Sequence, residues 1–227
     1  MTSTDADAAE PDERPKGPHR VRMQDAACLI LIDRSGPKPK ILMGRRASAH
    51  VFMPDVYVFP GGRRDRLDHA LPYDGDLNPL VMDKLLARTS SRVGPARARA
   101  LALAALRELR EETGIRPAQE KGFDLGSLRY VARAITPPGG VRRYDTRFFL
   151  SFCEETVFDM SHFGDTDELE DLQWLDIAMV SSLKLARITQ TVLEDIKNLM
   201  KLDPSVPFGT PVPFYSMRHG HFVQSRL

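Results

Sequence analysis

The sequence predicts an α/β domain. Short apolar runs with strand character alternate along the chain with longer helical patterns, one of which spans residues 95–113 and is rich in alanine. Hydrophobic residues make up 42% and charged residues 28% of the 227 positions, which is typical of a globular protein with a buried core. We expect one domain over residues 21–227, preceded by a polar and disordered tail, residues 1–20.

The first half of this domain is predicted to hold three strands and two helices. The strand-like runs are residues 26–33, 40–45 and 56–59, and a turn-forming segment, residues 34–37, separates the first two. Pro60-Gly61-Gly62 ends the third run, and the polar stretch that follows contains a short helix around residues 78–88. Pro95 opens the long helix and Gly114 ends it. Within it, Ala102, Ala105, Leu106 and Leu109 form a buried face.

The second half returns to strands and then to helices. Strands are predicted at residues 128–135, 147–153 and 172–175, and helices at residues 177–185 and 188–202. The tail, residues 206–223, is rich in proline and aromatic residues and is expected to add one more strand or loop.

Composition excludes several functional classes. The net charge of +1 gives no general affinity for nucleic acid or anionic membranes, and the longest apolar runs are too short to cross a bilayer. The N-terminal segment lacks the apolar stretch of a signal peptide. Cys28 and Cys153 show no metal-type spacing, so a reducing cytoplasm is the expected location.

The most informative segment is the end of the long helix. Residues three and four apart are neighbours on a helix, so Glu108 lies beside Glu111 and Glu112. Three carboxylates this close repel one another, and a divalent cation removes the penalty. Hard oxygen ligands of this kind suit Mg²⁺ or Mn²⁺. The turn is therefore predicted to be a metal site.

These residues resemble the motif of the Nudix hydrolases, Gly-x5-Glu-x7-Arg-Glu-U-x-Glu-Glu-x-Gly-U, where U is aliphatic. Residues 107–115 match its second half in full, and Phe59-Pro60-Gly61-Gly62 is similar to its usual entry. The resemblance covers roughly residues 22–205 and implies an α/β/α sandwich with a mixed sheet. It also implies Mg²⁺- or Mn²⁺-dependent hydrolysis of the diphosphate linkage in a nucleoside diphosphate derivative.

The resemblance further implies roles for single residues. Glu108, Glu111, Glu112 and the Gly61 carbonyl would hold the metal ions, and Arg107 would pair with Glu111 and fix its side chain. In this family the general base is either a glutamate of the motif or an acid from a later loop. Glu168 and Glu170 are the later candidates here, and Glu168 is our choice.

Two departures from the motif stand out. A total of 44 residues separate Gly62 from Arg107, so roughly thirty residues are inserted inside the motif. Arg99 stands where the first glutamate should be, and a guanidinium cannot ligate a metal. Asp65 or Asp68 is a candidate substitute ligand. Arg99 also motivates an alternative function, a nucleotide-binding or regulatory protein without turnover.

The stretched motif is similar to that of peroxisomal-type CoA diphosphatases and their bacterial relatives. Of the CoA-associated motif, Leu42, Arg46 and Ala47 fit, whereas four other positions, Met43, Gly44, Val51 and Asp55, differ. A CoA-type substrate is the best single guess. Residues expected to contact a small nucleotide substrate are Arg46, Phe52, Gly62, Arg142, Arg143, Tyr144 and Arg147, since guanidinium matches phosphate oxygens and an aromatic ring stacks on a base. Pro211–Phe222 is a candidate segment for a homodimer.

Overall fold

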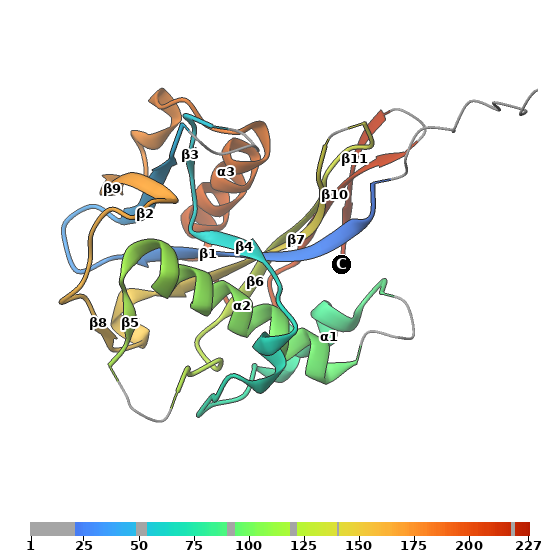
Figure 1. Ribbon diagram of the computed structural model, residues 1–227, viewed down its shortest axis with the longest axis horizontal. Helices are drawn as coiled ribbons and strands as arrows, with labels where there is room; N and C mark the ends of the chain where they lie inside the picture. The colour runs from blue at the N-terminus through green and yellow to red at the C-terminus, as the bar shows by residue number, and fades with distance from the viewer. Residues whose placement is uncertain (1–20, 49–53, 90–93, 119–121, 140, 219–220) are drawn as a thin grey trace, which may run out of the picture.

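The computed structural model describes residues 21–48, 54–89, 94–118, 122–139, 141–218 and 221–227. Within this part of the chain, nine strands form one sheet in the order β11-β10-β6-β7-β1-β2-β3, in which β4 also pairs with β1 and β9 with β2. The sheet is mixed because the β1–β7 and β6–β10 pairs are parallel and the other pairs are antiparallel. Helices α1 and α2 lie on one face of the sheet and α3 on the other (Figure 1). The predicted α/β fold with a mixed sheet is confirmed.

Most of the predicted strands are present. The main strands are β1 (Met23–Asp33), β2 (Lys40–Arg46), β3 (Tyr57–Val58), β6 (Arg129–Ile135), β7 (Arg143–Phe152) and β9 (Leu169–Asp176). The prolines and aromatic residues of the tail form an antiparallel hairpin, β10 (Pro213–Arg218) and β11 (His221–Arg226). Short strands β5 (Arg116–Pro117) and β8 (Phe158–Asp159) form a separate pair. The sequence did not predict β4 (Gly61–Arg63), which contains the double glycine and pairs with β1.

The helices follow the prediction with one exception. They are α1 (Pro79–Leu86), α2 (Pro95–Thr113) and α3 (Arg187–Leu202), and Gly114 ends α2 in the left-handed conformation with φ of 74°. The helix predicted at residues 177–185 is wrong, because this segment forms only turns and a short 3-10 helix at Val180–Ser182. The Asp176 side chain accepts a hydrogen bond from the Ala178 amide, and such local bonds compete with helix formation.

Two apolar clusters fill the space between the layers. One joins α1 and α2 to the sheet, and the other joins α3 to the opposite face. The four residues predicted as the buried face of α2 are all buried, but so are Ala100, Leu103 and Ala104 on other sides of the helix. The inserted segment after β4 covers those sides, since η1 (Leu67–Ala70) and α1 both pack against α2. Within the described residues, no helix is long and apolar enough to span a membrane.

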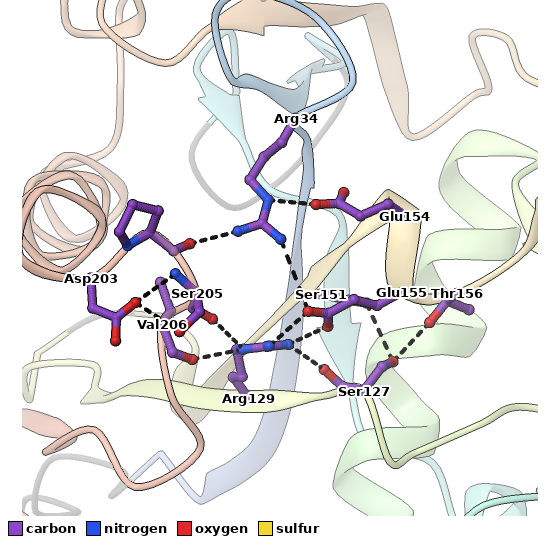
Figure 2. A network of polar contacts seen from close by, with 11 residues as sticks. Arg34, Ser127, Arg129, Ser151, Glu154, Glu155, Thr156, Asp203, Ser205 and Val206 are labelled. Carbon is purple, nitrogen blue, oxygen red and sulfur yellow. Dashed lines mark hydrogen bonds and ion pairs between the residues drawn. The ribbon is translucent and has the colours of Figure 1, made fainter.

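A buried arginine ties the end of the α3 layer to the sheet (Figure 2). Arg129 of β6 donates to the carbonyls of Ser127, Ser205 and Val206 and forms a two-bond ion pair with Glu155 at 2.5 and 2.8 Å. Its guanidinium also lies 4.9 Å from the Phe152 ring centroid and 4.6 Å from that of Phe208. This network holds the loop between α3 and β10 in place.

Candidate active site

A cavity of about 810 Å³ lies beside β1, β4 and the last turns of α2. The double glycine forms part of one wall, and the three glutamates of the long helix face the same space. Residues from the segment before β7 and from the loop before β9 form the remaining walls. The predicted site residues that line it are Arg46, Gly61, Gly62, Arg107, Glu108, Glu111, Glu112, Arg142, Arg143, Tyr144 and Glu168. A cavity of this size accommodates a nucleotide-sized ligand.

The three glutamates of α2 have different surroundings. Glu112 is only 5% exposed and accepts a hydrogen bond of 2.7 Å from the Gly61 amide. The Glu108 side chain is 12% exposed, whereas that of Glu111 is 48% exposed at the rim. Gly61 of the double glycine therefore contacts the innermost carboxylate, Glu112, directly through its backbone.

Gly62 is required by the position of Glu108. A Cβ atom at residue 62 would lie 2.5 Å from Glu108 Oε1 and 2.8 Å from Oε2, much closer than atoms can approach. The absence of a side chain at Gly62 thus leaves room for the Glu108 carboxylate against the backbone of β4. This explains why the site needs a second glycine as well as a turn at this point.

Arg107 organises the outer carboxylates. Its guanidinium lies 2.6 Å from Glu111 Oε2, as predicted, and 2.9 Å from Glu108 Oε1. It also donates to Asp68 Oδ1 at 2.7 Å and to the Arg63 carbonyl at 3.0 Å. One side chain therefore connects two motif glutamates to the inserted segment.

The carboxylates in the cavity form a negatively charged cluster. Burial raises the pKa of Glu112 to about 8, and the negative charges of Glu108 and Glu168 add to this increase. Burial also raises the pKa of Glu108, to which Glu111 and Glu168 contribute as well. Because Glu168 comes from a loop distant in sequence, the fold has brought a fourth acid to the motif glutamates. Glu170, the other candidate base, instead pairs with Arg45 at 2.7 Å.

This donor set fits a divalent cation by its chemistry. Carboxylate oxygens are the preferred ligands of Mg²⁺ and Mn²⁺, and the mutual repulsion of these acids is the penalty that such an ion removes. Among the described residues, however, no three His, Cys, Asp or Glu side chains are already gathered closely enough to hold a metal ion. Glu108 and Glu111 are instead turned towards Arg107. Metal binding therefore requires a change of side-chain rotamer at this turn.

Neither candidate substitute for the first motif glutamate has a free carboxylate directed at the cluster. Asp68 is fully buried, and its oxygens accept bonds from Arg107 and from the Asp65 amide. The Asp65 side chain lies in the cavity wall and accepts from the Leu67 amide. Arg99 forms a two-bond ion pair with Asp76 of the inserted segment, with both distances 2.8 Å.

One predicted substrate-binding residue, Arg147, is not among the described residues that line the cavity. Another, Phe52, lies outside the described residues. Arg147 points to the opposite face of the sheet, because Thr146 and Phe148 line the cavity and side chains alternate along a strand. β7 begins at Arg143, four residues before the predicted start of this strand at residue 147, and its alternation directs the Arg147 side chain away.

Sequence reasoning also missed residues of the site. Gln24 and Ala26 of β1 and Thr189 of α3 line the cavity, although none carries a chemical signature. Asp68, a candidate metal ligand from the sequence, instead pairs with Arg107, and no signal in the sequence distinguishes the two roles.

Comparisons with known proteins show similarity to one family. Residues 97–196 match the NUDIX domain. A NUDIX hydrolase from Alicyclobacillus acidocaldarius is 26% identical with a TM-score of 0.56, over 77% of this chain and 90% of that protein. No curated protein matches the sequence.

Two further solved structures are similar at lower identity. The NUDIX domain of Shewanella oneidensis NrtR, complexed with ADP ribose, is 15% identical with a TM-score of 0.49, over 82% of this chain and 93% of that one. The MutT protein from Methanosarcina mazei Go1 is 13% identical with a TM-score of 0.48, over 78% and 95% of the two chains.

The domain match and the Alicyclobacillus structure support the prediction that the protein is a hydrolase. The matched residues include the motif on α2 and extend through the acidic loop before β9 into α3. Residues 97–196 thus match the NUDIX domain, and the chain has a mixed α/β fold similar to that of the Alicyclobacillus Nudix hydrolase.

Proposed function

We propose that the protein hydrolyses the diphosphate linkage of a nucleoside diphosphate derivative with the help of Mg²⁺ or Mn²⁺. The observation that carries this proposal is the distribution of charge in one cavity. Acids from α2 and from the loop before β9 lie on one side, and Arg46, Arg142 and Arg143 also line it. Acids of this kind suit a divalent ion, and arginines suit phosphate oxygens.

Each group has a role in this reaction. A divalent ion held by Glu108, Glu111 and Glu112 would neutralise the charge that builds up on the phosphate oxygens. Arg142 and Arg143 orient the diphosphate, and Tyr144 lies beside them for contact with the base. A water molecule attacks one phosphorus, its proton passes to the Glu168 carboxylate, and the bond from that phosphorus to the bridging oxygen breaks. Arg107 positions Glu108 and Glu111.

The first substrate to test within this class is a CoA-type diphosphate, because Leu42, Arg46 and Ala47 share part of the CoA-associated motif. The purified protein is assayed with CoA, nucleoside diphosphate sugars, dinucleotides and dinucleoside polyphosphates, with Mg²⁺, Mn²⁺ or EDTA. We expect metal-dependent release of a phosphorylated product from at least one of them. If none is hydrolysed with either metal, the proposal is wrong.

Glu168 and Glu170 offer a matched pair of variants for the general base. Both acids lie at the start of the same strand region, but only Glu168 lines the cavity, whereas Glu170 pairs with Arg45. We expect Glu168→Gln to lower kcat by about 10²- to 10⁴-fold with little change in Mn²⁺ affinity. Glu170→Gln should retain nearly full activity. Equal activity of the two variants would exclude Glu168 as the base.

The alternative, a nucleotide-binding regulator without turnover, is favoured by one specific observation. Arg107 engages both Glu108 and Glu111, and Arg99 occupies the first motif position. Calorimetry with the same nucleotides separates the two functions. A regulator would bind nucleotide without forming a metal-dependent product, whereas an enzyme would release one.

A further inference from the structure

A second cavity, of about 260 Å³, lies on the face of the sheet that α2 covers. Its wall contains Met23 and Asp25 of β1, Asp145 and Arg147 of β7, and Arg133 of β6. The end of α1 and the first turn of α2 complete it with Arg88, Thr89 and Arg97. Nothing in the proposed reaction uses these residues.

The two cavities lie back to back across the sheet. On β1, Gln24 and Ala26 line the catalytic cavity, whereas Met23 and Asp25 line the second one. The same alternation occurs on β7, where Arg147 belongs to the second cavity. Side chains of adjacent strand residues point to opposite faces, so the second cavity is separate from the catalytic one.

The surroundings of this second cavity carry more positive than negative charge. Asp25 is contacted by Arg64 at 3.4 Å, by Arg97 at 2.5 Å and by Arg147 at 3.3 Å. Asp145 is contacted by Arg133 at 2.7 Å and also by Arg147 at 3.1 Å. Four guanidinium groups therefore share two carboxylates, and no other ion pair of these arginines occurs within the described residues.

The side chains of Asp25, Arg133, Asp145 and Arg147 are all more than nine-tenths buried, and their charges balance one another. The excess of positive charge lies at the partly exposed edge, where the side chains of Arg64 and Arg97 are 18% and 38% exposed. These positive charges attract an anion to this edge. Arg88, which also lines the cavity, adds a fifth positive charge at its exposed side. The N-terminal end of α2, which supplies Arg97, contributes a further positive potential.

Arg147 has donor groups available for such a ligand. Its hydrogen bonds to described residues, to Asp25 and the Asp145 carbonyl, are made by Nη1, which leaves Nη2 and Nε available. A guanidinium group can bind phosphate oxygens through two hydrogen bonds. The volume of the cavity equals that of about nine water molecules at ~30 Å³ each. A phosphate group with some bound water fits this space, whereas a complete nucleotide does not.

We propose that this cavity binds a phosphate group, either as inorganic phosphate or as the phosphate end of a small monoester, through Arg97, Arg133 and Arg147. It is a second anion site, separate from the catalytic cavity and independent of the hydrolytic reaction.

The probe is inorganic phosphate, titrated calorimetrically into the full chain in EDTA at constant ionic strength. We expect saturable binding and a rise in melting temperature that chloride does not produce. Methyl phosphate, a small monoester, is titrated in parallel. Tighter binding of this compound would identify a monoester as the ligand, and binding of phosphate alone would identify the free anion. If neither binds saturably, the proposal is refuted.

A matched pair of variants at Met23 locates the binding. Met23 lines the cavity and is 44% exposed, so both substitutions are tolerable. Met23→Glu places a carboxylate beside the arginines and should weaken phosphate binding by about tenfold or more through charge repulsion. Met23→Gln, which has nearly the same shape without charge, should bind as the parent does. Equal affinities of the two variants would refute the location.

Two further variants complete the test. Arg142→Ala alters only the catalytic cavity and should leave phosphate binding in EDTA unchanged. Loss of binding in this variant would assign the phosphate to the catalytic cavity and overturn the proposal. If Met23→Glu does not fold, Arg88→Glu replaces it, because this exposed side chain donates only to Ser225 among the described residues. It should also weaken binding.

Discussion

Arg107 offers the sharpest test of how the motif is held together. We consider Arg107→Met, which retains much of the side-chain volume but removes the charge and all donors. In the structure this guanidinium contacts Asp68 at 2.7 Å, and the Asp68 side chain has no exposed surface. Among the described residues, the variant therefore leaves a fully buried carboxylate with only the Asp65 amide as a donor.

The expected size of the effect follows from this burial. Breaking a buried ion pair by removing one partner costs about 3–5 kcal/mol of unfolding free energy. The contacts of Arg107 with Glu111 add little, because Glu111 is 48% exposed. The double variant Arg107→Met/Asp68→Asn removes the buried charge of Asp68 together with its partner, so that of these two effects only the lost contact with Glu108 remains. We therefore expect its loss to be smaller than the sum of the two single losses by about 2–3 kcal/mol.

Urea denaturation of the metal-free protein measures these free energies. Arg110→Met is the matched control, since Arg110 lies on the same helix, is 47% exposed and approaches only Glu111, at 3.9 Å. Its effect should stay within about 0.5 kcal/mol. A loss below about 1 kcal/mol for Arg107→Met would contradict the reasoning, as would strictly additive single and double variants.

Three further predictions concern other parts of the molecule. Gly62→Ala should lower kcat by about 10²-fold because its Cβ would displace the Glu108 carboxylate. The control Gly94→Ala should be active, since a Cβ at residue 94 meets no atom within 4 Å. Retained activity of Gly62→Ala would contradict the role given to Gly62. Arg129→Met should lower the unfolding free energy, measured by urea denaturation, by about 2–3 kcal/mol, since Glu155 and three carbonyls lose their donor. A change as small as that caused by replacing an exposed arginine would show that the network does not stabilise the fold. Hydrogen bonds from Ser161 and then Arg116 hold the pKa of Asp159 at about 2, so its stabilising effect is full above the ordinary pKa of about 4 and is lost as the pH falls through 2. The difference in melting temperature between the parent protein and Asp159→Asn should therefore narrow from pH 6 towards pH 2, and a constant difference would refute the assignment.

Features with local physical causes could be predicted from the sequence. Pro95 and Gly114 gave both ends of α2, because the first fixes a helical φ and the second adopts the left-handed conformation. The pairing of Arg107 with Glu111 follows from helical spacing alone. The mixed α/β fold followed from the order of the predicted elements and from the resemblance to the Nudix hydrolases.

Features that depend on distant contacts were not accessible in this way. The strand β4 forms because β1 provides a partner, although glycine is unfavourable in strands. The side to which Arg147 points depends on where β7 begins, and an error of a few residues in the start of a strand hides its alternation. The partner of Asp68 could not be chosen from the sequence, since both a metal ion and an arginine suit a carboxylate.

The two ion pairs between α2 and the inserted segment constrain how this protein can be redesigned. Asp76 pairs with Arg99 and Asp68 with Arg107, at points about 12 Å apart along the helix at 1.5 Å per residue. A chimera with a short spacer would leave both arginines without their acids and would uncover the alanine-rich sides of α2. The arginine at position 99 and the inserted segment thus depend on each other, because the segment supplies the acid that pairs with this arginine. A design that shortens the segment should therefore replace Arg99 at the same time.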